Sequence, residues 1–135
     1  MLIDALILDC RVDKHGDRFT PDCLKEIAGK PLSGKNNAVI LNSNPKDGVG
    51  QIQNIWYKNR KLYVRVELNK KLGTTIIEKY ILSPAIKIIE CNRKNIEGKI
   101  IRTIKKGELY NLSLIDRDIR AVVNATMVFR KKEVK

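Results

Sequence analysis

The residues best suited to chemistry lie near the N-terminus, where the single histidine of the chain, His15, stands between Asp13 and Asp17. A base with an acidic neighbour to orient it is the arrangement that nucleophilic catalysis requires. Gly16 completes a turn in which aspartates bond to their own backbone and the glycine takes a positive φ. A histidine in such a charged turn is more often a solvated loop residue. No nucleophile elbow, phosphate-binding loop or metal-ligand pair occurs, so we expect no cofactor and no metal.

Basic residues gather in a second segment, beside aromatic ones. The cations are Lys58, Arg60, Lys61, Arg65, Lys70 and Lys71, and the aromatic residues are Trp56, Tyr57 and Tyr63. A barrel that binds single-stranded nucleic acid would stack bases on such rings and follow the phosphates with such charges. Aromatic residues that simply cover a core under a solvated hairpin are the alternative.

The composition sets limits on the class of protein. The 135 residues fit one domain, and 27 basic residues against 15 acidic ones give a net charge of +12. This imbalance favours an anionic partner, either nucleic acid or an acidic protein surface. No apolar run reaches the 18 or so residues of a membrane helix, and the N-terminus does not read as a secretory signal. The three scattered cysteines suggest reduced thiols in a cytoplasmic setting.

The pattern of apolar residues predicts a chain dominated by strands. We expect a helix over Pro21 to Ala28, capped by Thr20 and closed by Gly29, and a second helix over Lys71 to Lys79. Asn42 to Gly50 has the composition of a long irregular loop. The expected strands are Leu2 to Val12, Ala38 to Leu41, Val49 to Tyr57, Leu62 to Leu68, Tyr80 to Glu90, Ile96 to Ile104, Leu109 to Ile115 and Val122 to Val128.

These elements predict an α+β fold dominated by β-structure. It would be a small antiparallel barrel of six to seven strands with two short helices, closed or nearly so, over residues 1–129. Residues 130–135 would form a basic C-terminal tail that includes Arg130, Lys131 and Lys132.

The order of several short motifs resembles the prohead maturation proteases of tailed phages, which are relatives of the herpesvirus assemblin fold. The resemblance runs from about residue 2 to residue 124. Its landmarks are Val12 to Pro21 before the first helix, Ala38 to Pro45, Val49 to Ile52, Lys61 to Val64, Leu82 to Ile86 and Leu109 to Ile115.

The resemblance implies a serine protease site, and this chain departs from it at two positions. Ser83 stands where the family has its nucleophile, but Ser43 stands at the position of the catalytic histidine and Asn111 at that of the third member. Neither a hydroxyl nor an amide can take the proton of a serine near neutral pH. His15 could act instead only if its loop lay over Ser83.

We therefore expect a non-catalytic structural protein of the virion, an auxiliary or decoration protein bound to the capsid of a tailed phage. Its partners would be the major capsid protein or other virion proteins, met in the host cytoplasm during assembly and kept in the virion. The expected contact residues are Lys58, Arg60, Lys61 and Arg65 in the hairpin, and Arg130, Lys131 and Lys132 in the tail. An active maturation protease with an unconventional base and a nonspecific nucleic-acid-binding barrel are the alternatives.

Overall fold

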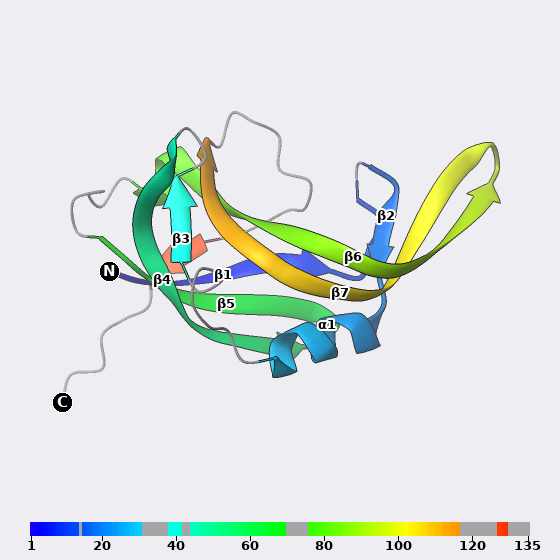
Figure 1. Ribbon diagram of the computed structural model, residues 1–135, viewed down its shortest axis with the longest axis horizontal. Coiled ribbons are helices and arrows are strands. Elements are labelled where there is room, and N and C mark those ends of the chain that lie inside the picture. Colours follow the sequence, from blue (N-terminus) through cyan, green and yellow to red (C-terminus); the bar gives the residue numbers. More distant parts are fainter. Residues whose placement is uncertain (14, 31–37, 42–43, 70–75, 117–126, 130–135) are drawn as a thin grey trace.

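The computed structural model of the chain describes residues 1–13, 15–30, 38–41, 44–69, 76–116 and 127–129. Its elements follow one another along the chain in an order dominated by strands (Figure 1). They are β1 (Leu2–Asp9), β2 (Asp17–Phe19), α1 (Pro21–Gly29), β3 (Ala38–Leu41), β4 (Asn44–Lys58), β5 (Lys61–Leu68), α2 (Ile76–Lys79), β6 (Tyr80–Ile96), β7 (Lys99–Asp116) and β8 (Met127–Phe129).

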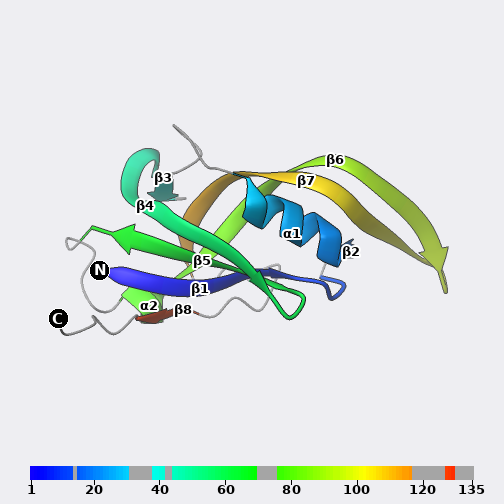
Figure 2. The ribbon, with the colours of Figure 1, turned by 90° about the horizontal axis from the view of Figure 1, so that it is seen from below.

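All eight strands that the structure describes belong to one curled sheet. From one side the order runs β8, β1, β5, β4, β3 and β7, with antiparallel pairs up to β3 and a parallel pair between β3 and β7. Strand β6 pairs with one edge of β7 along almost the whole length of β7. On the opposite edge of β7, β2 pairs near the beginning of the strand and β3 pairs near its end. The sheet thereby curls into an open half-barrel, as the view from below shows (Figure 2).

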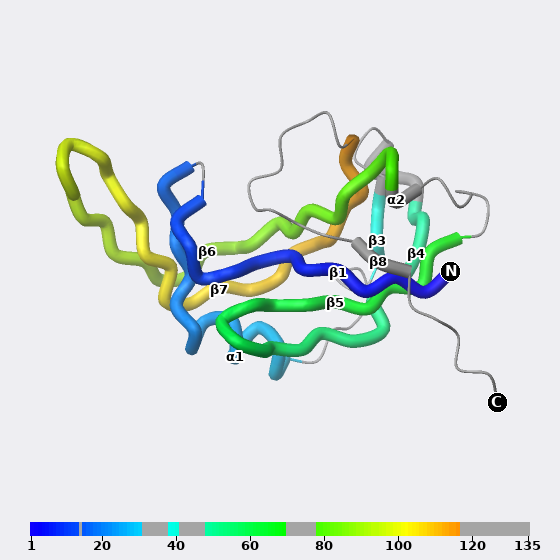
Figure 3. The backbone as a smooth tube through the Cα atoms, turned by 180° about the vertical axis from the view of Figure 1, so that it is seen from behind, coloured from blue at the N-terminus to red at the C-terminus, as the bar shows by residue number. Residues whose placement is uncertain are grey.

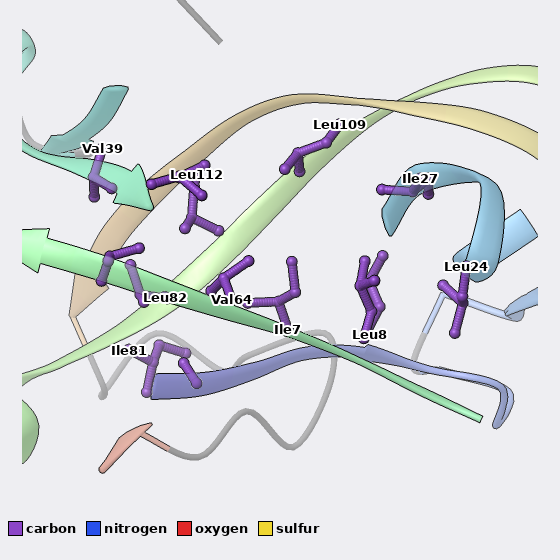
Figure 4. Close-up of a cluster of buried hydrophobic side chains, with 14 of the residues drawn as sticks. Ile7, Leu8, Leu24, Ile27, Val39, Val64, Ile81, Leu82, Leu109 and Leu112 are labelled. Atoms are coloured by element: carbon purple, nitrogen blue, oxygen red, sulfur yellow. The ribbon is translucent and has the colours of Figure 1, made fainter. Parts of the chain in front are cut away.

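The core fills the inside of this curve because the strands alternate between buried and exposed positions. In β5 the residues Leu62, Val64, Val66 and Leu68 are buried, and the residues between them are half-buried. Helix α1 covers one side of the curve and buries Cys23, Leu24 and Ile27. Figure 4 shows Leu24 and Ile27 with Leu8, Val64 and Leu109 in this one cluster.

The local signals around α1 are confirmed. The Thr20 side chain accepts a hydrogen bond from the Cys23 backbone N–H at 3.1 Å, and Pro21 opens the helix. Gly29 is the last helical residue, although the chain leaves through Lys30 in an extended conformation. The predicted hairpin is also present, and its turn places Asn59 and Arg60 at φ values of 50° and 63°.

The prediction of a β-dominated α+β fold is confirmed, but that of an antiparallel barrel of six to seven strands is wrong. Over the described ranges the sheet has eight strands, and β2 and β3 both run parallel to β7. The short β2 was missed because residues 13–17 read as a turn. Residues 44–50 belong to β4 rather than to a loop, since irregular pairing with β3 accommodates the one proline and two glycines of this stretch.

The second half of the chain also differs from its prediction. Three expected strands merge into β6 and β7, which join in one long hairpin with shifts of register after Ala85, Ile88 and Glu90. Helix α2 is a single turn at Ile76–Lys79, and the remainder of the predicted second helix up to residue 75 is outside the described residues. Of the strand expected at 122–128, only the end in β8 is described.

The buried thiols of Cys10 and Cys23 have low reactivity. Burial raises the pKa of Cys23 to about 11, with the charge of Glu26 as a smaller cause, and burial also raises the pKa of Cys10. A thiol that stays protonated is a poor nucleophile. These cysteines therefore act as small core residues.

The raised pKa of Cys23 predicts a loss of stability at alkaline pH. The unfolded chain releases this proton at about pH 9, so the native state loses stability as pH rises from about 9 to about 11. In urea titrations at pH 8 and pH 10.5, the stability difference between the protein and the Cys23→Ala variant should shrink by about 2 kcal/mol. Parallel pH profiles of the two proteins would contradict the assignment.

Candidate functional site at the junction of three strands

The residues that could form a site meet where β3, β6 and β7 lie side by side. Ser113 of β7 is paired with Ser83 of β6 on one side and with Ile40 of β3 on the other. Because directly paired residues share a face of the sheet, the three lie in one row. Ser113 is buried and its hydroxyl donates to the Ser83 backbone carbonyl at 3.5 Å.

The other two positions implied by the resemblance stand in a definite relation to this row. Asn111 lies two residues before Ser113 in β7, half-buried and paired with Ala85. It therefore shares the face of Ser83 and Ser113. Ser43 is outside the described residues, two positions along the chain from Leu41 at the end of β3.

A cavity of about 190 Å³ opens beside β6, and Ser83 is among its lining residues. Most of its wall is apolar and comes from β1, β2, β6 and β7, as with Ile7, Phe19 and Ile86. Its polar lining groups besides Ser83 are Asp13, Asp17 and Arg102. The cavity thus joins the end of the acidic turn to the serine-bearing strand.

The acidic turn is held tightly against β7. The Asp13 carboxylate accepts hydrogen bonds from the backbone N–H groups of His15 and Asp17, both at 2.9 Å. Asp17 accepts two bonds from the Arg102 guanidinium, each at 2.8 Å. These bonds raise the pKa of Arg102 above its usual range. Asp13 therefore closes the turn, and Asp17 holds the turn to the sheet.

His15 has a different place from the one that catalysis would need. Its residue is exposed, and it is not among the described residues that line the cavity, although its neighbours Asp13 and Asp17 are. Among the described residues, the polar groups near Ser83 are the Ser113 hydroxyl, the Asn111 amide, the paired Asp13 and Asp17 carboxylates and the Arg102 guanidinium. These groups can form hydrogen bonds to a ligand.

The basic hairpin between β4 and β5 presents part of its charge to solvent. Lys58, Arg60 and Lys61 are exposed. Arg65 instead binds the Asp4 carboxylate, with its Nε 2.8 Å from Oδ1, and lies 5.3 Å from the Trp56 ring centre. Arg65 is thus largely neutralised in place.

The aromatic residues of this hairpin are engaged with one another. Trp56 and Tyr63 stack with ring centres 5.6 Å apart and 13° between their planes. Such a cross-strand pair stabilises the hairpin and leaves less ring surface for nucleotide bases. The tail residues Arg130, Lys131 and Lys132 are outside the described residues.

Two further classes of site can be assessed for the described residues. Within these ranges no three histidine, cysteine, aspartate or glutamate side chains cluster closely enough to hold a metal ion. Among the helices that the structure describes, none combines the length and the apolar character needed to cross a bilayer.

Sequence reasoning named Asp17 only as a neighbour of His15, and it missed Ser113 and Arg102 as parts of this region. Asp17 and Arg102 are separated by 85 positions, and only the parallel pairing of β2 with β7 brings them together. The sequence around Leu112 and Leu114 gives no sign of the residue opposite Ser113. No single-sequence signal reports such long-range partners.

Comparison with protein families, with curated proteins and with solved structures finds no match to this chain.

The acidic turn depends on Gly16, and a matched pair of variants tests this. Gly16 and Gly98 have nearly equal φ values of 79° and 80°. A Cβ added at Gly16 would lie 2.8 Å from the Ile100 carbonyl oxygen, whereas a Cβ added at Gly98 would have no atom within 4 Å. In each alanine variant the left-handed backbone conformation should lower the free energy of unfolding by about 1 kcal/mol. Gly16→Ala should lose at least about 1 kcal/mol more in urea unfolding, and equal losses would contradict the close approach.

Proposed function

We propose that this chain is a non-catalytic binding protein with a prohead-protease-like fold, acting as an auxiliary or decoration protein of a tailed-phage capsid. The proposal combines the resemblance in the sequence with the arrangement of three strands, the groups beside Ser83 and the exposed basic hairpin.

The arrangement of β3, β7 and β6 is the observation that carries the proposal. The resemblance puts its catalytic positions just after β3, on β7 and on β6, which are far apart along the chain. Ser83 and Asn111 share one face at the junction, and β3 is the neighbour of β7 there. Adjacent strands are what a site shared by these positions requires.

The lack of catalysis follows from the chemistry beside Ser83. Ser113 stands directly opposite it, and the amide of Asn111 is the next side chain on that face of β7. A serine without a base keeps its proton, and losing the members of such a site lowers the rate by orders of magnitude. The fold would then serve for binding.

The capsid contacts belong to the exposed cations. Lys58, Arg60 and Lys61 project from one turn and stay free to approach an acidic surface. Arg65, which Asp4 neutralises, contributes less. Rim charges of this kind mainly speed the encounter and fix its orientation.

One observation favours the alternative of an active maturation protease. Ser83 lines the same cavity as Asp13, whose carboxylate holds the backbone of His15. A shift of this turn could bring the imidazole toward the serine, which would then have an unconventional base.

A serine-directed fluorophosphonate separates these two functions. The non-catalytic protein should label no faster than its Ser83→Ala variant, because an unactivated hydroxyl reacts at the background rate. Gel fluorescence with an active serine protease as positive control measures the labelling. Labelling at Ser83 that His15→Ala abolishes would establish the protease instead.

Copy number in particles tests the structural role. A decoration protein should be found in purified mature capsids at a fixed ratio of many copies to the major capsid protein, measured by quantitative mass spectrometry. Presence in immature shells followed by loss on maturation would favour a protease that leaves. Complete absence from both kinds of particle would reject the capsid proposal.

A further inference from the structure

The β6–β7 hairpin extends beyond the body of the half-barrel as a two-stranded arm, which we define as residues 92–103. The ribbon and the reverse tube view both show it projecting past β2, at the far end from the N-terminus (Figures 1 and 3). Residues 92–100 are all exposed. A tight turn ends the arm, with Glu97 and Gly98 at φ values of 52° and 80° and the Asn95 side chain accepting from the Gly98 N–H at 3.0 Å.

The arm carries charge of one sign on both of its faces. It has four basic residues and one acidic residue, Glu97 in the turn. The register pairs Arg93 with Arg102, which places these two on one face, while Lys94 and Lys99 lie on the other. Arg18 of β2 adds a cation to the second face at the base of the arm, where it donates to Thr103 at 3.1 Å.

Arg93 and Arg102 are like charges directly opposite each other, an arrangement that destabilises a hairpin. Asp17 offsets one of these charges through its pair with Arg102. Among the described residues, Arg102 is the only cation of the arm that forms an ion pair. A β-ribbon arranged in this way gains stability when an anion binds.

The exposed isoleucines follow the same two-sided pattern. Ile100 is 66% exposed and Ile96 is 40% exposed. They lie on opposite faces, because Ile100 pairs with Asn95 and Ile96 pairs with Lys99. A flat protein surface would cover only one face of the arm. A second copy of this chain would bring positive charge against the positive arm, so the two would repel each other.

From these observations we propose that the arm binds double-stranded nucleic acid by lying in a groove between the two phosphate backbones. The major groove, roughly 12 Å wide, admits a two-stranded β-ribbon. Cations on both faces then meet phosphates on both walls of the groove. The five residues from 92 to 96 span about 17 Å, along which a duplex carries about ten phosphates. The inference depends on the arm alone and goes beyond the proposed capsid function.

Binding of a 30-base-pair duplex of mixed sequence, followed by fluorescence anisotropy between 50 and 200 mM NaCl, tests the proposal. The arm variant is Arg93→Gln/Lys94→Gln/Lys99→Gln. A matched control, Lys58→Gln/Arg60→Gln/Lys61→Gln, removes the same three charges from the β4–β5 hairpin. Circular dichroism should show both variants folded, since these side chains are exposed.

The arm variant should bind the duplex about tenfold or more weakly at 100 mM salt. The slope of log affinity against log salt should also become shallower by about 2 to 3, because each lost phosphate contact removes about 0.9. The control should change affinity less than the arm variant, and a single strand of equal length should bind the protein more weakly than the duplex.

Three results would overturn the proposal. They are equal weakening in the two variants, no duplex binding by the unaltered protein at 50 mM salt, and displacement of the duplex by polyglutamate at equal total charge. The last result would show that the arm responds to any acidic polymer rather than to the groove of a duplex. None of them bears on the fluorophosphonate or capsid experiments, so the two proposals fail separately.

Discussion

The pairing of β7 is the constraint on which the rest of this structure depends. Its 18 residues have backbone groups on two edges that need partners. Strand β6 covers one edge, and β2 and β3 each cover a short part of the other. Because β2 and β3 run parallel to β7, the chain between them must cross over, and α1 in this connection packs on the core.

Two consequences of this pairing reach the surface. Near the end of β7 the partners bring Ser83, Ser113 and Ile40 into one row, and at its beginning β2 brings Asp17 to Arg102. Beyond β2, within the part of the chain that the structure describes, β6 and β7 continue alone, so the outer part of the arm, residues 94–101, projects as a two-stranded ribbon (Figure 3). The serine junction and the basic arm are thus the two ends of one strand.

Charge is distributed unevenly over this frame. The net charge of +12 lies on a protein whose best acid–base pairs, Arg65 with Asp4 and Arg102 with Asp17, sit against the sheet. Such half-buried, doubly hydrogen-bonded pairs orient side chains and secure strands. The cations at the tips of the two hairpins remain without such partners among the described residues, which is why both hairpins are candidates for binding an anionic surface.

Much of the fold was accessible from the sequence, since local chemistry decides local structure. The cap at Thr20, the turn at Asp13 and Gly16, and the alternation from Leu62 to Leu68 each depend on neighbours within a few residues. The resemblance likewise singled out Ser83 and Asn111, which the sheet brings to one face. The places of Ser43 and of the basic tail are outside the described residues.

By itself, the sequence determined helix α1, most of the strand-forming segments, the apolar faces of those segments, and the net positive charge. Tertiary structure alone decided that β2 and β3 flank β7 in parallel, that Arg65 and Arg102 are neutralised, and that one hairpin leaves the body as an arm. The physical reason is range. Apolar alternation and turn chemistry act over a few residues, whereas the ion pairs of Asp4 with Arg65 and of Asp17 with Arg102 join positions 61 and 85 residues apart.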